Sequence, residues 1–495
     1  MQPSLSPSEN SEASIRRAVL LALMFLVLAV QAMLPIDDPD IWWRFRMGEW
    51  IATHRAVPYV DHFSANDMGK PWIEYSWAFA LMVYWIHSSL GLVGIVYFIV
   101  LLGILVAYAA YRLIRGAGLP IQAEVALVAM ALGAMKSLMT PRPWLITMLF
   151  FAIELLIIYR ARTTEKTRLL WFLPVLFVAW ANIHIQFVYG LAAVGLLFGE
   201  ALLASCAKSR GWDLAVPAFS LRTLALVNIA CVAATFLTPY HYLLYDQVLS
   251  YMFVQVGAFQ YLSELHPMLF RSPGDWLVLA MTILAAFALG WQRRWPPFSA
   301  MLLLIAAFVA FRARRDVWMV ALVSLAIIGD TARSVLPNKV YDFSKGQLLV
   351  AALVSLAALT FIGHSRGIDE KNLKSVVEEK FPVQAVNYIK SNRLPGPLFN
   401  HYDWGGFLLW ALPDVPVSMD GRTNLFGDRR IERSLAAWDG AAGWESEPDL
   451  LKAKLVIAEK HRPLTTLLKS RAGFKLVYED HNSVVFVGEP SSTGK

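Results

Sequence analysis

The chain has 495 residues, of which 57% are hydrophobic and 16% are charged. Soluble domains carry about 25% charged residues, so this composition excludes an ordinary soluble protein and places most of the chain in a membrane. The formal net charge of +7 is small for this length, and basic cytoplasmic loops account for it without a nucleic-acid partner. The two cysteines, Cys206 and Cys231, fall in apolar stretches, which is typical of core residues rather than of a disulfide or metal site.

A polar tail at residues 1–17 precedes the first apolar stretch. The tail is too long and too acidic for a typical signal peptide, so we expect the apolar stretch after it to be retained as a helix. A membrane span needs about 20 apolar residues, and roughly eleven stretches near that length predict a polytopic α-helical transmembrane domain at 18–363. The expected spans lie near 18–35, 90–111, 121–139, 143–159, 169–183, 186–205, 222–238, 274–290, 297–312, 316–330 and 346–363.

Flanking charge predicts the orientation of these spans. Arg16 and Arg17 precede the first span and indicate a cytoplasmic N-terminal tail, because cytoplasmic loops carry an excess of Lys and Arg. Alternation of the spans places a large first outer loop at 35–76 and the C-terminal segment at 364–495 on the opposite side. The basic loops expected on the cytoplasmic side are YRLIRG (111–116), YRARTTEKTR (159–168), AKSRG (207–211), WQRRW (291–295) and DTARSVLPNK (330–339).

The segment at 364–495 has ordinary polar composition and predicts a small α/β domain, periplasmic or extracellular, of a normal domain size. Helical periodicity is expected at 375–391 and 463–470. The strand-like stretches are GPLFN (396–400), VPVSMD (415–420), KLVIAE (454–459), FKLVYED (474–480) and SVVFVGE (483–489).

An arginine cluster stands between two apolar stretches on the predicted outer side, where positive charge is disfavoured. It comprises Arg312, Arg314 and Arg315, with Arg142 predicted on the same side. One interpretation is an anion site, because arginine forks bind phosphate in a bidentate manner. The alternatives are a re-entrant element, a helix count that is off by one, or a pairing of Arg315 with Asp316.

Three acids open the first outer loop in the stretch LPIDDPDIWW: Asp37, Asp38 and Asp40. Carboxylates fixed near a basic cluster are candidates for a divalent cation site, with Mg or Mn as the metal, or for a general base. The adjoining Trp42–Trp43 pair is typical of anchoring at the lipid interface. Asp67 and Glu74, further along, are interpreted as acids of a solvated loop.

Polar residues interrupt a further apolar stretch in WANIHIQF (180–187), where Asn182 and His184 suit either a structural helix end or a substrate contact. The DGR tripeptide at 420–422 favours a turn at a strand end over a sugar contact. Gly405 and Gly406 indicate a turn or a close backbone approach. No phosphate-binding or dinucleotide-binding loop is present, so no nucleotide cofactor is expected.

Several of these motifs resemble those of a known group of membrane proteins. DPDIWWR, WANIH, TPYH, FRARRD and DWGGFLLW…MDGR resemble the motifs of a bacterial group of membrane proteins, and the first outer loop resembles that of the GT-C membrane glycosyltransferases. Arg44 stands where the bacterial group usually carries His, and Thr238 where it carries Asn.

The resemblance implies a GT-C-like inverting transferase at the outer face of a bacterial inner membrane. The donor would be a polyprenyl-phosphate-linked sugar, reached from membrane lipid, and the acceptor a glycan, lipid or protein. Asp38 or Asp40 would be the general base or metal ligand, and the arginine cluster with Arg142 would bind the lipid phosphate. Asp61, Arg44, Asn182 and His184 are further candidates.

Two alternatives stay open. A transporter or flippase of lipid-linked saccharides typically shows charges at the membrane midplane and paired halves, whereas this chain shows no internal repeat. A non-catalytic membrane assembly protein on the same scaffold would present the C-terminal domain to partners.

Overall fold

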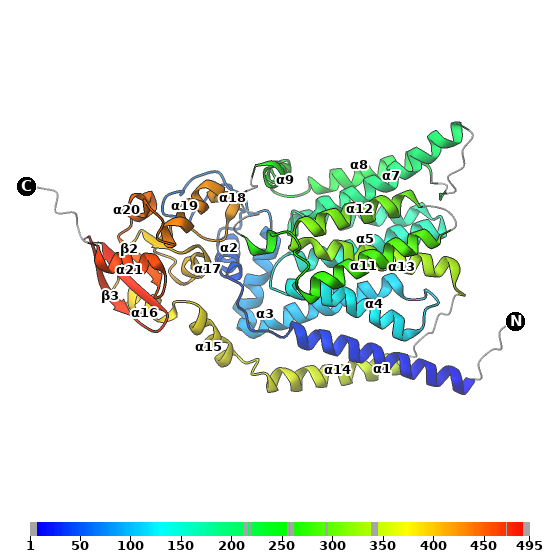
Figure 1. Ribbon diagram of the computed structural model, residues 1–495, viewed down its shortest axis with the longest axis horizontal. Helices are drawn as coiled ribbons and strands as arrows, with labels where there is room; N and C mark the ends of the chain where they lie inside the picture. The colour runs from blue at the N-terminus through cyan, green and yellow to red at the C-terminus, as the bar shows by residue number, and fades with distance from the viewer. Residues whose placement is uncertain are drawn as a thin grey trace, which may run out of the picture. The chain divides into compact units, whose positions relative to one another are not determined.

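The computed structural model describes residues 7–210, 216–217, 219–254, 257, 262–292, 296–337, 345–471 and 473–488. The chain forms two compact units, and Figure 1 labels their elements. Unit 1 comprises Met1–Leu34, Val96–His241 and Ser263–Ile368, and unit 2 comprises Pro35–Ile95, Tyr242–Leu262 and Asp369–Lys495.

All regular elements among the described residues of unit 1 are helices. Helix α13 packs against α11 and α12, and α6 packs against α8. Helix α1 packs against α14 (Figure 1). The helices that begin in this unit are α1 (Pro7–Ala32), α4 (Ile121–Ala134), α5 (Trp144–Thr164), α6 (Leu173–Ile183), α7 (Phe187–Ser209), α8 (Leu221–Thr235), α11 (Pro273–Trp291), α12 (Pro297–Arg312), α13 (Val317–Val335) and α14 (Lys345–Ser365).

Each predicted span contains helix, and among the described residues five helical segments are long and apolar enough to cross a membrane. A helical membrane protein with a small sheet near its C-terminal end is therefore confirmed at this coarser level. Six further apolar helices are only 10–17 residues long, so the count of eleven spans stays a prediction. The membrane-length segments are Trp77–Ile114, Trp144–Thr164, Phe187–Ser209, Pro273–Trp291 and Arg314–Val335. Residues 211, 293–295 and 338–339 of the predicted basic loops lie outside the described part of the chain.

Helix α3 (Trp77–Ile114) belongs to both units and is broken at Gly91, where φ is 63°. This left-handed conformation suits glycine, since a side chain is strained there. On the unit 2 side, the Glu370 carboxylate accepts the N–H of Leu92 at 2.9 Å. A carboxylate at a helix N-terminus is favoured by the unpaired N–H groups and the helix dipole, so Glu370 stabilises the restart of α3.

Unit 2 contains a four-stranded sheet in the order β1-β2-β4-β3. Strand β1 (Leu398–Asn400) runs parallel to β2 (Leu455–Glu459), whereas β4 (Ser483–Gly488) is antiparallel to β2 and to β3 (Phe474–Glu479). The other elements are α2 (Asp40–His54), α9 (Leu243–Phe253), α15 (Glu370–Lys380), α16 (Val383–Ser391), α17 (Tyr402–Ala411), α18 (Thr423–Phe426), α19 (Asp428–Trp438), α20 (Pro448–Leu451) and α21 (Pro463–Ser470).

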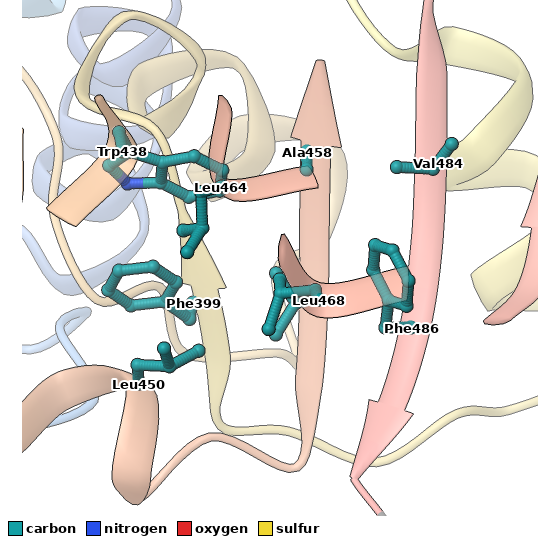
Figure 2. Close-up of a cluster of buried hydrophobic side chains, with 9 residues drawn as sticks. Phe399, Trp438, Leu450, Ala458, Leu464, Leu468, Val484 and Phe486 are labelled. Atoms are coloured by element: carbon teal, nitrogen blue, oxygen red, sulfur yellow. The ribbon is translucent and has the colours of Figure 1, made fainter. Parts of the chain in front are cut away.

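The sheet core is a buried apolar cluster, shown in Figure 2, in which the rings of Phe399 and Trp438 stack at 5.0 Å. Four of the five predicted strands are confirmed. The fifth, 415–420, forms only isolated bridges from Val417 to Ser64 and Leu398. Its backbone is shared between the first outer loop, where the N–H of Ala65 donates to Val417, and strand β1, where the N–H of Ser418 donates to Leu398.

The first outer loop is an integral part of unit 2 and contains helix α2. Our interpretation of Trp42 and Trp43 as lipid anchors is wrong, because their exposed fractions are only 1% and 5% within this unit. Trp42 packs edge-on against Phe381 and Phe407 at 5.5 and 5.3 Å. The domain limits expected from composition, 18–363 and 364–495, stay predictions. The division into units 1 and 2 follows the contacts of the fold instead.

Candidate functional site

Helix α2 begins at the acids singled out in the sequence. The Asp38 side chain, buried at 5% exposure, accepts the N–H of Asp40 through Oδ1 at 2.9 Å. Asp40 lies in the first turn of α2 and is half-buried. Both carboxylates lie at the positive end of the α2 helix dipole. Asp37, in contrast, is exposed and pairs with Lys380 at 2.8 Å.

Two glycines allow backbone to pack closely against the start of α2. A Cβ built on Gly421 would collide with Oδ1 of Asp40 and would lie 3.0 Å from Nε1 of Trp43. A Cβ on Gly406 would lie 2.6 Å from the carbonyl oxygen of Pro39. The expectation of a close backbone approach at Gly406 is thus confirmed, although α17 rather than a turn contains this residue.

Arg44, on the next turn of α2, is buried beside a carboxylate. Its Nη1 lies 3.7 Å from Oε1 of Glu74, and its guanidinium stacks over the Trp43 ring at 4.3 Å. Among the described residues, Nε and Nη1 of Arg44 have no hydrogen-bond acceptor. Buried donors normally have acceptors, so these two N–H groups are suited to an acceptor that a ligand supplies.

Glu74 directly precedes α3 and accepts the N–H of Ser76 at 2.8 Å. Burial raises the pKa of Glu74, and this effect outweighs the opposing attraction of Arg44, with Asp40 adding to the rise. The neighbouring Tyr75 lies within 3.3 Å of the Tyr251 hydroxyl. We call Asp38, Asp40, Arg44, Glu74 and Tyr75 the Asp40 cluster. The cluster combines the carboxylates of Asp40 and Glu74 with the Arg44 guanidinium, whose Nε and Nη1 have no acceptor among the described residues.

A second buried ionic group lies in the same unit. Arg422 donates through Nη1 to Asp61 at 2.6 Å, through Nε and Nη2 to Asp420 at 2.8 and 2.7 Å, and through Nη2 to Ser64 at 3.0 Å. Burial by itself would raise the pKa of Asp61, but Arg422 and Ser64 outweigh it and hold this pKa below its ordinary value. We call Asp61, Ser64, Asp420 and Arg422 the Arg422 cluster. All its charged groups are paired, so its arrangement is that of a structural clamp.

A cavity of about 460 Å³ opens on the side of α2 that carries Arg46 and Glu49. Its floor is aromatic, with Trp42, Phe407 and Trp410, while its rim is charged. The rim charges include two ion pairs, Arg46 with Glu49 at 2.7 Å and Lys374 with Glu370 at 3.4 Å, and one further charge of each sign, on Glu378 and Lys390. Such a lining suits a polar but uncharged ligand of the size that protein pockets usually take.

The predicted outer arginines lie in unit 1, and two of them pair with carboxylates. Arg142 contacts Glu264 at 2.7 Å, and Arg314 contacts Asp275 at 3.0 Å. Arg312 is exposed and Arg315 is half-buried. Asp316, which was considered as a partner of Arg315, accepts from Gln186 at 2.7 Å and from Tyr189 at 3.1 Å.

Asn182 and His184 make contacts at helix ends within unit 1. The Asn182 amide donates to the carbonyls of Val178 and Leu237 at 2.8 and 2.9 Å. His184 lies 2.9 Å from the Thr147 hydroxyl, which also accepts from Trp180 at 2.9 Å. These contacts fit the structural interpretation of both residues.

The structure therefore groups Asp38, Asp40 and Arg44 in one cluster and assigns Asp61 to another, both in unit 2. Glu74 and Tyr75 complete the Asp40 cluster and were missed, because an acid in a long loop is typical of a solvated surface. The sequence feature that distinguishes Glu74 from a solvated acid is that it comes just before Trp77, where the apolar helix α3 begins. A joint site with the arginines of unit 1 stays a prediction.

No protein-family model matches the chain, and no curated protein matches it. The resemblance to GT-C glycosyltransferases consequently stays a prediction, and the functional argument rests on the geometry of the Asp40 cluster.

Proposed function

We propose that this chain is a membrane glycosyltransferase that transfers a sugar from a polyprenyl-phosphate-linked donor to an acceptor. The observation that supports this most directly is the Asp40 cluster. A half-buried carboxylate at a helix N-terminus lies near Glu74, whose pKa is raised, and near a guanidinium whose Nε and Nη1 have no acceptor among the described residues. Clusters of buried groups with shifted pKa values are typical of reactive sites.

The proposed reaction uses these groups in distinct roles. Asp40 takes the proton of an acceptor hydroxyl, whose oxygen then forms a bond to the anomeric carbon of the sugar. The bond from that carbon to the phosphate oxygen breaks, and its electron pair leaves with the polyprenyl phosphate. Attack opposite the leaving group inverts the anomeric carbon. Arg44 donates to the phosphate oxygens as negative charge develops on them.

The aromatic cavity beside α2 is the proposed binding place for sugar residues of the acceptor. Arg46 is six residues after Asp40 on the same helix, a rise of about 9 Å. Aromatic rings offer apolar faces to sugar rings, while the paired rim residues offer donors and acceptors for hydroxyl groups. A saccharide acceptor is thus favoured over an apolar one.

The dependence of the proposed reaction on a divalent cation, Mg or Mn, is a separate prediction. Among the described residues, no group of three or more His, Cys, Asp or Glu side chains is arranged to hold a metal ion. Asp38 already uses one carboxylate oxygen to accept the Asp40 N–H. We therefore assign no step to Mg or Mn, and the dependence is tested by assaying activity after chelation and after Mg or Mn is returned.

The central experiment compares matched carboxylate variants of the purified chain. Polyprenyl-phosphate-linked sugars extracted from bacterial membranes serve as donors, and released polyprenyl phosphate is measured. We expect Asp40→Asn to lower turnover by about 10²- to 10⁴-fold, the usual contribution of a general base. Asp37→Asn, a change of the same chemistry at an exposed neighbour, should retain turnover. Absence of turnover in the unaltered chain, or equal turnover in Asp40→Asn, would reject the proposal.

The Arg312→Gln variant in the same assay tests whether the arginine cluster of unit 1 binds the donor phosphate. Its turnover should fall at limiting donor and recover at high donor concentration, because a phosphate contact acts through binding. Unchanged donor dependence would remove Arg312 from the site.

We also propose the inner membrane of a bacterium, with unit 2 outside and the N-terminus in the cytoplasm. Labelling of single cysteines tests this after the exposed Cys206 is replaced. Met68→Cys and Ser391→Cys, both at exposed positions of unit 2, should react with an impermeant reagent in intact cells. Ser209→Cys, at the end of α7, should react only after permeabilisation, and the opposite pattern would invert the orientation.

A further inference from the structure

Four arginines line one cavity in unit 1. The cavity has a volume of about 420 Å³ and lies where α3, α5 and α13 end. Arg112 and Arg115 come from the end of α3 and the turn after it, Arg160 from the last turns of α5, and Arg333 from the last turn of α13. The sequence analysis predicted that these three segments are basic loops on one side of the membrane. In the structure, residues of all three line the same cavity.

The arginines of this cavity have few carboxylate neighbours. No acidic side chain is among the described residues that line it. Arg112 donates to the Tyr108 hydroxyl at 3.1 Å, and Arg333 donates to the carbonyl of Leu113. The nearby acids Asp330 and Glu124 act on Arg333 from outside the lining.

Helix dipoles account for only part of this positive charge. The C-terminal ends of α3, α5 and α13 meet here, and each carries about half a negative charge, which favours cations. Asp330 and Glu124 offset further charge at Arg333 from outside the lining. The described lining itself presents guanidinium groups and no carboxylate, and this favours an anionic ligand.

We propose that this cavity binds a phosphate group with net negative charge. Guanidinium groups match phosphate oxygens in a bidentate manner, and several arginines together supply both charge and orientation. The three helices are all among the membrane-length segments, and a cavity at the ends of membrane-spanning helices is within reach of lipid headgroups. The phosphate belongs either to an anionic lipid or to a soluble molecule, and both sources share this chemistry. The proposal is independent of the glycosyltransferase assignment.

The test uses the full chain purified in a neutral detergent. Two probes are compared: inorganic phosphate, and detergent micelles that contain phosphatidylglycerol, with phosphatidylcholine micelles as the uncharged reference. We expect phosphatidylglycerol or phosphate to raise the Tm and to bind more weakly as ionic strength increases. Tighter binding of phosphatidylglycerol than of phosphate identifies a lipid headgroup, and the reverse identifies a soluble phosphate compound.

Variants connect the binding to this cavity. Arg112→Gln and Arg160→Gln should each weaken binding by about ten-fold, since each removes charge-assisted hydrogen bonds. Arg168→Gln, an exposed arginine of the same predicted loop that does not line the cavity, is the matched control and should bind as the unaltered chain does. Each single variant is first shown to keep its Tm without ligand. Failure of the unaltered chain to bind either probe, or unchanged binding in both variants, would overturn the proposal.

Discussion

The Asp40 cluster and the Arg422 cluster are both buried carboxylate–guanidinium groups of unit 2, but their charges are satisfied to different degrees. Arg422 donates to two carboxylates and a hydroxyl at 2.6 to 3.0 Å. Arg44 lies 3.7 Å from Glu74, and its Nε and Nη1 have no acceptor among the described residues. The two arginines are almost equally buried, so burial does not explain the difference. The comparison shows which of two similar groups holds the fold together and which is arranged for a ligand.

The electrostatics of the two carboxylates support this division. The pKa of Asp61 is held low by Arg422 despite burial, whereas burial raises the pKa of Glu74 despite Arg44. A well-paired buried charge is costly to disturb, because removal of one partner leaves the other buried without compensation. A poorly paired buried charge already destabilises the fold, so its removal should cost function rather than stability.

Arg422→Gln tests the structural side of the comparison and should have the largest effect. It leaves Asp61 and Asp420 buried without their cation, which costs about 3–5 kcal/mol of unfolding free energy. Chemical denaturation of the purified chain measures this loss. Arg429→Gln, at an exposed position of α19, is the control and should change stability by less than about 0.5 kcal/mol. A small loss in Arg422→Gln would show that the clamp is not structural.

Glu74→Gln tests the functional side. The raised pKa means that protonated Glu74 favours folding at low pH, and this contribution is lost as pH rises through the folded-state pKa and the carboxyl ionises. The uncharged Gln avoids that loss, so we expect stability at neutral pH to stay equal or to increase. Turnover should fall by about 100-fold, because Glu74 positions Arg44 in the Asp40 cluster and a misplaced catalytic group costs about this much. A variant that loses stability but retains turnover would assign Glu74 to the scaffold instead.

His401 adds a third kind of buried group, one that is satisfied in its neutral form. Burial, with Arg462 nearby, lowers the pKa of His401 to about 3, and its Nδ1 accepts the Asp403 N–H at 3.3 Å. A lowered pKa gives stability above the unfolded value of about 6.5, and this stability is lost as pH falls. Acidification from about pH 6.5 to about pH 5 should therefore cost about 2 kcal/mol.

The measurement for His401 is hydrogen exchange of the peptide that spans β1 and α17, recorded across this pH range in the full chain. After correction for the intrinsic pH dependence of exchange, protection should fall with pH in the unaltered chain. His401→Gln should show a weaker dependence, because Gln has no proton to gain. An identical pH dependence in both proteins would remove His401 as its cause.

Local sequence patterns predicted the helices of unit 1 and four strands of unit 2, since periodicity and hydropathy act over short distances. Contacts between residues that are far apart in the sequence leave no such local pattern. The bond from Arg422 to Asp61 joins residues 361 positions apart. From the sequence, Asp61 was therefore predicted to be a candidate active-site acid. In the structure it belongs to the Arg422 cluster, which is arranged as a structural clamp.

The start of α2 also shows how far local sequence patterns can predict a site. DDPD near the end of an apolar stretch predicted a site at Asp38 and Asp40, with Arg44 as a further candidate, and the structure adds Glu74 to it. The tryptophan pair matched the pattern of a lipid anchor, but its partners Phe381 and Phe407 lie in a distant part of the sequence. A dipeptide cannot indicate whether its side chains meet lipid or protein.

Gly421→Ala is the smallest change that separates the two clusters. The new Cβ would occupy the position next to the Asp40 carboxylate, which has to move, whereas the adjacent Arg422 keeps its partners. Misplacement of a general base without its loss should lower turnover by about ten-fold, well short of the effect of Asp40→Asn. Gly405→Ala is the matched comparison, because its Cβ would collide with the backbone carbonyl of Met419 and should lower stability instead. Equal effects of the two substitutions on turnover and stability would mean that the position of Asp40 has no special role. A loss of turnover confined to Gly421→Ala would tie the reaction to the carboxylate at the start of α2.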